Sequence, residues 1–293
     1  MSAVKNYLSL VKFSHTIFAM PFAVIGFFLG TTQTATNLNS SPWYVGGEIK
    51  LLLVIFCMIF ARSAAMAFNR WADYKFDSEN ERTKIREIPK GIISRGNALF
   101  FVIANCILFI IIAFFINRIC FYLSPVALIV ILGYSYTKRF TPLCHLVLGL
   151  GLALAPIGAF LAVTGEFKLL PLLYAFVVLF WVSGFDIIYA LQDEEFDRSQ
   201  NLKSIPVYLG TKNALLLSRF LHLIAASLVL YAGYTAEFHL WYWIGAAIFI
   251  FLLIYQHTLV KPNDLSKVTL AFATTNGIAS VAFACFFLLE LFS

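Results

Sequence analysis

Long apolar runs, separated by short polar segments, follow one another along almost the whole sequence. Each run reaches about the 20 residues that a helix needs to cross the hydrocarbon core of a bilayer. None of them alternates apolar and polar residues in the way that is typical of a transmembrane β-barrel. The nine runs cover residues 13–30, 47–68, 98–116, 119–136, 144–163, 169–190, 213–234, 240–259 and 268–291. We therefore expect an all-α, polytopic membrane protein, with nine transmembrane helices bundled in a single domain over residues 1–293.

The charged residues are few and lie mainly on one side of the predicted membrane. Of the 293 residues, 61% are hydrophobic and only 12% are charged, about half of the roughly 25% that soluble domains carry. The segments before span 1 and after the even-numbered spans hold 16 lysines and arginines, against three on the other side. Because basic loops stay in the cytoplasm, we expect a cytoplasmic N-terminus. The net charge of +6 is explained by this bias and by an anionic substrate, and nothing indicates nucleic acid or a protein partner.

Two acidic segments, each at the end of a predicted span, repeat the same spacing. Asp193 follows Asp73 by 120 positions, and Asp197 follows Asp77 by the same interval. Carboxylates four residues apart on a helix share one face, and both segments fall on the predicted cytoplasmic side. Charges in or beside a membrane span are costly unless they serve a site. The two segments therefore predict a functional site rather than two solvated loops.

A second, shorter sequence pattern that recurs beside the acidic segments indicates an internal repeat. Ile88, which precedes a proline, recurs as Ile205, which also precedes a proline. Span 2 then corresponds to span 6. The shift of four spans is an even number, so the two repeats have the same orientation. Halves of roughly 1–140 and 141–293 in parallel place both acidic segments in one cytoplasmic cap, unlike the inverted repeats of many transporters.

Together, the acidic segments offer ligands for a hard divalent cation. Oxygen ligands suit Mg²⁺, which completes its coordination shell with water and substrate phosphates. No cluster of cysteine or histidine accompanies them, which argues against zinc, iron or copper. The predicted metal ligands, which are also catalytic residues, are Asp73, Asp77, Asp193, Asp197 and Asn69.

Basic residues close to the acidic segments are suited to a diphosphate group. Guanidinium and ammonium groups bind phosphate oxygens, and the candidates are Arg82, Arg86, Lys138, Arg139 and Lys203. Arg62 and Asp186 lie deeper, seven positions before Asn69 and Asp193. Seven residues are close to two helical turns, so both share a face with the predicted ligands. We expect Arg62 to meet an anionic substrate group and Asp186 to orient groups in the pocket as a catalytic residue; the alternative is a buried ion pair between the two.

These residues resemble the motifs of the UbiA superfamily of intramembrane aromatic prenyltransferases. The first family motif, Asn-Asp-x2-Asp-x3-Asp followed by Arg-Thr, a further Arg, Pro and Gly, is similar to Asn69, Arg70, Asp73, Asp77, Arg82, Thr83, Arg86, Pro89 and Gly91. The second, Asp-x2-Tyr-x3-Asp-x3-Asp, is matched by Asp186, Tyr189, Asp193 and Asp197. Between them, the family's Tyr-x3-Lys-Arg-x-Thr stretch is matched by Tyr134, Lys138, Arg139 and Thr141, and Asn276 stands where the family also places an asparagine.

The resemblance implies a helical bundle whose central cavity is capped by cytoplasmic loops. Two magnesium ions would hold the diphosphate of a polyprenyl donor, and a small aromatic acid would lie beside it. The resemblance also adds Tyr134, His145, Tyr189 and Asn276 to the substrate-binding residues. Within the family, the sequence is most similar to 4-hydroxybenzoate polyprenyltransferases, which serve quinone biosynthesis at the inner membrane of bacteria.

Several alternatives stay open. Arg70 replaces an aspartate of the family motif, and His145 stands where ubiquinone-type enzymes often have glutamine. The stretch 63–70 resembles a subgroup linked to menaquinone, for which 1,4-dihydroxy-6-naphthoate is a plausible acceptor. His145 either orients the phenol proton of the acceptor or has a structural role.

Other reaction classes fit the sequence less well. Related enzymes prenylate haem, chlorophyllide or glycerol-phosphate lipids, but the stretch 134–141 and the spacing of the second motif favour a small aromatic acceptor. A transporter of an anionic solute would place its charges near the membrane midplane. Here the charges lie at the predicted cytoplasmic ends of the spans.

Overall fold

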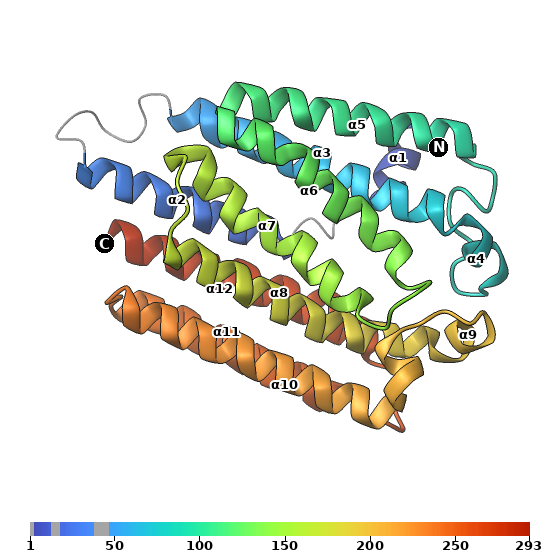
Figure 1. Cartoon of the computed structure of the whole chain (residues 1–293). Helices are drawn as coiled ribbons and strands as arrows, with labels where there is room; N and C mark the ends of the chain where they lie inside the picture. The colour runs from blue at the N-terminus through green and yellow to red at the C-terminus, as the bar shows by residue number, and fades with distance from the viewer. Residues whose placement is uncertain (1–2, 13–17, 38–46) are drawn as a thin grey trace.

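The computed structural model describes residues 3–12, 18–37 and 47–293, and its regular elements in these ranges are helices that run side by side in one bundle (Figure 1). This confirms the expected all-α fold. The helices are α1 (Ala3–Leu10), α2 (Met20–Asn37), α3 (Gly47–Ala72), α4 (Tyr74–Glu79), α5 (Arg95–Ile116), α6 (Arg118–Thr137), α7 (Cys144–Thr164), α8 (Leu169–Ala190), η2 (Leu191–Asp193), α9 (Glu194–Ser199), α10 (Ile205–Thr235), α11 (Leu240–Leu259), the π-helical turn η3 (Leu270–Thr275) and α12 (Asn276–Phe292).

Eight of the described helices are long and apolar enough to cross a membrane, namely α3, α5, α6, α7, α8, α10, α11 and, together with η3, α12. The chain is therefore a multi-pass membrane protein. The remaining predicted span corresponds to α2, whose C-terminal half carries the polar residues Thr31, Thr32 and Gln33, while residues 13–17 of that span lie outside the described ranges. The predicted count of nine spans is accordingly not confirmed.

The two ends of the described chain lie at opposite ends of the bundle, which fits an odd number of long helices (Figure 1). The short helices α4 and α9 lie at the same end as α1, and this end is called the cap end below. Each short helix follows a long one, α4 after α3 and α9 after α8. The two acidic segments therefore meet at one end of the bundle, as two repeats of the same orientation require.

The helix α8 is the most deeply buried of the candidate spans, and it packs closely on α7 and α10. A Cβ atom on Gly149 of α7 would lie 2.4 Å from the carbonyl oxygen of Leu179 on α8. A Cβ atom on Gly184 of α8 would lie 2.3 Å from the His222 ring on α10. Small residues let membrane helices approach closely in this way. The tight packing gives the polar residues at the cap end of α8 a rigid support.

Candidate active site

The two acidic segments have the same local structure. Asp73 stands at the break between α3 and α4, with φ −90° and ψ 11°, and Asp193 stands at the break before α9, with φ −108° and ψ 6°. This bridge region of backbone space is sparsely populated, and many active-site residues lie in it. Asp77 and Asp197 are then the fourth residues of α4 and α9, and both are buried. The repeat in the sequence is thus also a repeat in backbone geometry.

A cavity of about 270 Å³ lies at the cap end, between the two acidic segments. It brings together nearly all of the residues that the sequence singled out. Those that line it are Arg62, Asn69, Asp73, Asp77, Arg82, Arg86, Tyr134, Lys138, Arg139, His145, Asp186, Tyr189, Asp193 and Asp197. We call it the polar cavity.

Each of the four aspartates is paired with one of the predicted phosphate-binding residues. Arg86 Nη1 lies 2.7 Å from Asp77 Oδ1, Lys138 Nζ 2.6 Å from Asp197 Oδ2, and Arg139 Nη2 3.2 Å from Asp73 Oδ1, while Arg82 pairs with Asp193. Asn69 joins the set, because its Nδ2 donates to Asp73 Oδ2 over 3.1 Å. The carboxylate charges are therefore balanced within the cavity.

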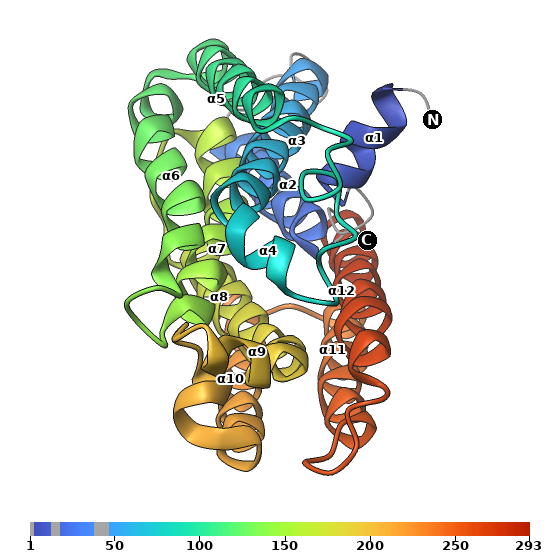
Figure 2. The same cartoon turned by 90° about the vertical axis from the view of Figure 1, so that its right-hand side faces the viewer.

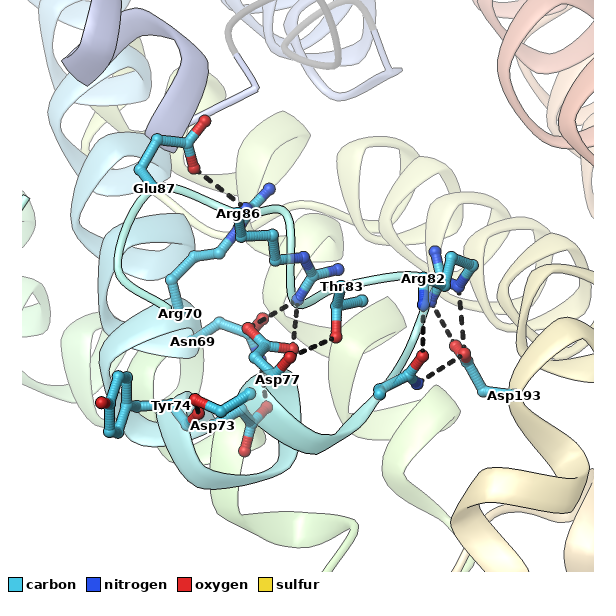
Figure 3. A network of polar contacts seen from close by, with 12 residues as sticks. Asn69, Arg70, Asp73, Tyr74, Asp77, Arg82, Thr83, Arg86, Glu87 and Asp193 are labelled. Carbon is cyan, nitrogen blue, oxygen red and sulfur yellow. Dashed lines mark hydrogen bonds and ion pairs between the residues drawn. The ribbon is translucent and has the colours of Figure 1, made fainter. Parts of the chain in front are cut away.

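Arg82 makes the most extensive of these contacts (Figure 3). Its Nε donates to Asp193 Oδ1 over 3.0 Å, its Nη2 contacts Asp193 Oδ2, and its Nη1 donates to the Tyr189 hydroxyl over 2.9 Å. Asn80 supports the pair: its side-chain amide donates to Asp193 Oδ1 over 3.2 Å, and its carbonyl oxygen accepts from the Arg82 backbone N–H. The loop after α4 is thereby joined to the end of α8.

The charges and the burial of the site shift the pKa of several groups. Burial raises the pKa of the Asp73 carboxyl to about 6, an effect that the hydrogen bond from Arg139 opposes and the neighbouring Asp77 reinforces. Burial lowers the pKa of Lys138, but the Asp197 carboxylate outweighs it and raises the pKa above its ordinary value. Lys138 is thus held in its cationic form, whereas burial makes the Asp73 carboxylate easier to protonate than an exposed aspartate.

Arg62 lies where the polar cavity meets a second, apolar cavity of about 360 Å³. Arg62, Met66 and Tyr134 line both cavities. The apolar cavity runs between α3, α5, α6 and α7 as far as Ile116 and Leu161, near the ends of α5 and α7 opposite the cap. Within the described part of the chain, Arg62 Nε is buried without a hydrogen-bond partner. A buried, unpaired donor is costly, so this guanidinium is suited to an anionic ligand.

Asp186 pairs with His145 and not with Arg62. His145 Nδ1 lies 2.7 Å from Asp186 Oδ2, and the backbone N–H of Ile205 donates to His145 Nε2 over 3.4 Å. These partners require a proton on Nδ1, which donates to the carboxylate. The alternative of an Arg62–Asp186 ion pair is therefore not what the structure contains. Both ring nitrogens of His145 therefore have partners, which favours the alternative that His145 has a structural role and positions Asp186.

Asn276, predicted to bind substrate, is fully buried and does not line the polar cavity. Its Oδ1 accepts a hydrogen bond from Trp181 Nε1 over 2.8 Å, and its Nδ2 donates to Gln256 Oε1 and to the backbone oxygens of Ala271 and Phe272. These contacts satisfy the side chain and tie α8, α11 and the π-helical turn together. The structure thus gives Asn276 packing contacts between helices, and its assignment to substrate binding stays a prediction.

Lys203 also lies outside the polar cavity. Its side chain is exposed and donates to the backbone oxygen of Phe140 over 3.3 Å. Its backbone N–H donates to the Lys138 carbonyl oxygen over 2.6 Å. Lys203 therefore supports the position of Lys138 through the backbone, and its assignment to the diphosphate stays a prediction.

Some polar residues of the cavity were not predicted. Lys12, Asn80 and Ser135 line it. Lys12 directly precedes the first predicted span on the basic side, a position that could have drawn attention to it. Asn80 belongs to no motif, and only its contact with Asp193 reveals its role.

Arg70, which replaces an aspartate of the family motif, directs its guanidinium toward the loop between α4 and α5 (residues 80–94), which we call the cap loop. Its side chain is only 3% exposed, and its Nη1 lies 3.3 Å from Glu87 Oε2 (Figure 3). The contact is an ion pair within the protein. Arg70 therefore fixes the loop that carries Arg86.

The oxygen-rich donor set fits a hard divalent cation, although the donors do not yet converge. Among the described residues, no three histidine, cysteine, aspartate or glutamate side chains form a ready metal cluster. The carboxylates instead face their cationic partners, and Asp197 Oδ2 is buried without a hydrogen bond of normal geometry. Four carboxylates around one cavity are the chemistry that Mg²⁺ prefers, and binding would require them to exchange partners.

The chain is similar to known proteins over most of its length. The model of the UbiA prenyltransferase family matches residues 17–288. Two curated relatives, both named 4-hydroxybenzoate octaprenyltransferase, are each 30% identical to this chain. The protein of Nitrosomonas eutropha matches 80% of this chain and 82% of its own length, and that of Nitrosomonas europaea matches 83% of each.

Solved structures share the fold. The apo structure of a UbiA homolog from Aeropyrum pernix K1 has a TM-score of 0.78 and 29% identity, and covers 95% of this chain and 97% of its own. A UbiA homolog from Archaeoglobus fulgidus, solved with GPP and Mg²⁺, has a TM-score of 0.74 and 23% identity, and covers 98% of this chain and all of its own.

Proposed function

The chain belongs to the UbiA prenyltransferase family, and on this premise we propose that it transfers the polyprenyl group of an allylic diphosphate to a small aromatic acid in quinone biosynthesis. 4-Hydroxybenzoate is the first candidate acceptor, because relatives that match 80% and 83% of the chain are named for it. The observation that carries the proposal is the meeting of a charged and an apolar cavity at Arg62. A donor with a charged head and a long apolar tail needs both.

The head of the donor is assigned to the polar cavity. Asp73, Asp77, Asp193 and Asp197, with Asn69, are the residues that would hold magnesium, as their oxygen-rich chemistry favours. When bound there, Mg²⁺ would neutralise charge on the departing diphosphate. Arg82, Arg86, Lys138 and Arg139 would turn from the aspartates to the diphosphate oxygens, which accept the same kind of charge-assisted hydrogen bond.

These cations act when the donor ionises. As the bond between the allylic carbon and the diphosphate oxygen breaks, negative charge accumulates on the leaving group, and contacts that strengthen with this charge lower the barrier. The allylic carbon then forms a bond to the ring carbon ortho to the phenol hydroxyl, and the ring proton is lost. Asp186, held by His145, is a cavity carboxylate that can accept a proton. The cap loop 80–94 limits the access of water, which would otherwise trap the cation.

The tail of the donor is assigned to the apolar cavity. From Arg62 to Val54, which also lines this cavity, α3 rises by about 12 Å. The cavity continues along α7 to Leu161. A polyprenyl chain that starts at the polar cavity can therefore extend through much of the bundle in apolar surroundings, where its burial is favourable.

The carboxylate of the acceptor is assigned to Arg62. Its unpaired, buried Nε would gain a charge-assisted partner, and its place at the junction would put the acceptor ring beside the reacting end of the donor. 1,4-Dihydroxy-6-naphthoate carries the same carboxylate, and it is the second candidate because Arg70 and His145 depart from the ubiquinone-type pattern.

The cap end is assigned to the cytoplasm. Most basic residues outside the spans lie in the connections at this end, which the positive-inside rule places in the cytoplasm. Polyprenyl diphosphates and small aromatic acids would then enter from the same side. The inner membrane of a bacterium is the expected location.

The test is a competition experiment with the purified protein, Mg²⁺ and a polyprenyl diphosphate. 4-Hydroxybenzoate and 1,4-dihydroxy-6-naphthoate are offered together, and the products are identified by mass. A prenylated 4-hydroxybenzoate supports the first acceptor, and a prenylated naphthoate supports the second. If neither product forms and no pyrophosphate is released, the proposed reaction is wrong and a transporter becomes the better hypothesis.

A further inference from the structure

The first helix of the chain is attached to the loop that carries two of the site's arginines. Ser9 of α1 donates a hydrogen bond to Glu87 Oε1, and the other oxygen of Glu87 accepts from Arg70. The next residue back along the loop, Arg86, pairs with Asp77 in the polar cavity. Glu87 therefore faces α1, whereas its neighbour Arg86 faces the polar cavity.

Apolar contacts strengthen this attachment. Leu10 of α1 is fully buried in one cluster with Ile88 and Ile93 of the cap loop and with Ala98 of α5. The ring of Tyr7 packs against that of Phe101 of α5, with the ring centroids 4.8 Å apart and the ring planes tilted by 30°. Figure 2, which looks onto the cap end, shows α1 at the rim of the bundle beside α3 and α5, with the α4–α5 loop running next to it. The helix and the cap loop thus form one unit at the edge of the bundle.

The outer side of this unit carries large apolar residues that no other part of the described chain covers. On α1, Val4 is 69% exposed and Leu8 47%. On the cap loop, Ile85 is 63% exposed and Ile92 52%. An eight-residue helix and a polar loop have little reason to expose such residues to water. At the rim of a membrane protein, the headgroup region of the bilayer can bury them.

The depth of α1 agrees with this location. Phe101, against which Tyr7 packs, lies on α5 next to Phe100, whose side chain is 73% exposed on a candidate membrane span. Arg95 lies over the rings of Trp71 and Tyr74, at 5.4 Å and 5.1 Å from their centroids. Aromatic and basic residues of this kind collect at the membrane–water interface. The unit therefore sits at the level of the lipid headgroups.

Its charge is predominantly basic. Lys5, Lys84, Lys90 and Arg95 are exposed on α1 and around the cap loop. Two acidic groups, Glu79 and Glu81, are exposed nearby, and Glu81 is paired with Lys84 at 2.5 Å. Glu87 is only 13% exposed and faces inward. The balance favours anionic headgroups, which attract basic residues near a membrane surface by about 1 kcal/mol each.

We propose that α1 and the cap loop 80–94 form an interfacial surface that binds the anionic lipid headgroups of the surrounding leaflet. The hydrogen bonds of Glu87 to Ser9 and Arg70 couple this binding to the cap loop. Anionic lipid thereby holds the loop that carries Arg82 and Arg86 over the polar cavity. The lipid contact itself is independent of the proposed function; only its effect on catalysis rests on it.

Hydrogen exchange of the full-length protein in nanodiscs tests the lipid contact without any substrate. One set of discs contains phosphatidylcholine alone, and the other contains equal amounts of phosphatidylcholine and phosphatidylglycerol. Local opening governs the exchange of such amides, so α1 and the cap loop should exchange several-fold more slowly in the anionic discs. High salt should reverse part of this slowing, because it screens the attraction.

Variants identify the surface that is responsible. Lys90→Gln should lose about fivefold of the lipid-dependent slowing, as expected for one basic residue. Leu8→Gln removes an apolar contact that does not depend on headgroup charge, so it should speed the exchange of α1 and the cap loop in both kinds of disc. Lys261→Gln, which removes an exposed charge on the connection between α11 and α12, is the matched control and should leave it unchanged. Ser9→Ala should reduce the response of the cap loop more than that of α1.

The proposal would be overturned if α1 and the cap loop each exchanged at the same rate in the two kinds of disc. It would also be overturned if Lys261→Gln had as large an effect as Lys90→Gln. Prenyl transfer measured in the same discs separates the two proposals. Lipid-dependent slowing of exchange in a protein that lacks transferase activity would uphold the surface and reject the proposed reaction. Transferase activity without lipid-dependent slowing of exchange would uphold the proposed reaction and reject the lipid-binding surface.

Discussion

Arg82 and Asp193, which lie 111 positions apart in the chain, form a two-point ion pair that joins the loop after α4 to the break between α8 and α9. The pair unites the two repeats at the cap end, and it occupies groups that we assign to the diphosphate and to the metal. Donor binding should therefore replace one set of ion pairs by another rather than fill a preformed set of free charges. This exchange leads to the first prediction.

Arg82→Lys should raise the KM for the donor by about 10-fold to 100-fold, the factor that corresponds to the roughly 1.5–3 kcal/mol of a hydrogen bond to a charged group. Lysine keeps the charge but loses the planar, two-point geometry. Initial rates over a range of donor concentrations measure the change. Lys84→Ala, two positions away and exposed, is the control, and an equal effect there would point to bulk charge instead of geometry.

Asp73→Ala and Asp193→Ala should each lower kcat/KM by at least about 100-fold, because each removes a ligand from a site that stabilises charge in the transition state. Glu79 and Glu195 are exposed acidic neighbours in the same two segments, so Glu79→Ala and Glu195→Ala should retain near-normal rates. Thermal stability in detergent establishes that each variant is folded. Near-normal turnover in both aspartate variants would refute the metal assignment.

Removal of divalent cations with a chelator should abolish turnover, and added Mg²⁺ should restore it. The reason is that the diphosphate brings further negative charge into a cavity whose four cations already balance its four carboxylates. Turnover is measured as the rate at which pyrophosphate is released. Full activity in the presence of excess chelator would show that Arg82, Arg86, Lys138 and Arg139 suffice on their own.

Arg62→Met should raise the KM for the acceptor by about 10-fold to 100-fold, with little effect on the KM for the donor. Methionine fills a similar volume but offers no donor to a carboxylate. The comparison of a benzoate acceptor with the matching phenol lacking the carboxylate isolates the contact, since the variant should lose its preference between them. An unchanged preference would move the carboxylate site elsewhere.

His145→Ala should lower kcat, and His145→Asn should recover part of the loss. The asparagine amide can replace the Nδ1–H donor to Asp186, which in the parent structure acts over 2.7 Å, whereas alanine leaves the carboxylate without it. The split between the two variants distinguishes positioning of Asp186 from mere filling of space. If both variants behave alike, in rate and in thermal stability, the hydrogen bond has no role in catalysis.

Much of this protein could be predicted from its sequence. A membrane span must satisfy its backbone hydrogen bonds internally, so apolar runs of sufficient length identify helices without any knowledge of their neighbours. The spacing of Asp73 and Asp77 recurs in Asp193 and Asp197. If the two repeats fold alike, this recurrence is enough to predict that the two acidic segments have the same local structure. The exception among the spans, α2, has polar residues in its C-terminal half, and a weak local signal of this kind leaves the number of crossings unconfirmed.

Which side chains meet was decided by the tertiary structure. Helical spacing placed Arg62 and Asp186 on faces suited to a pair. Instead, α7 packs on α8 so that Asp186 pairs with His145, and Arg62 Nε has no hydrogen-bond partner among the described residues. Asn276 matches a family position, but the π-helical turn before it directs its amide toward Trp181 and Gln256.

The sequence by itself determined that the chain is a helical membrane protein, and it identified most of the polar residues that line the polar cavity, because both follow from local composition and from spacing along a helix. Only the tertiary structure decided how those residues are paired, how two cavities meet at Arg62, and how Glu87 connects α1 to the cap. Such relationships depend on the rotation and tilt of each helix against its neighbours. These are set by the sum of many packing contacts, and no short stretch of sequence encodes them.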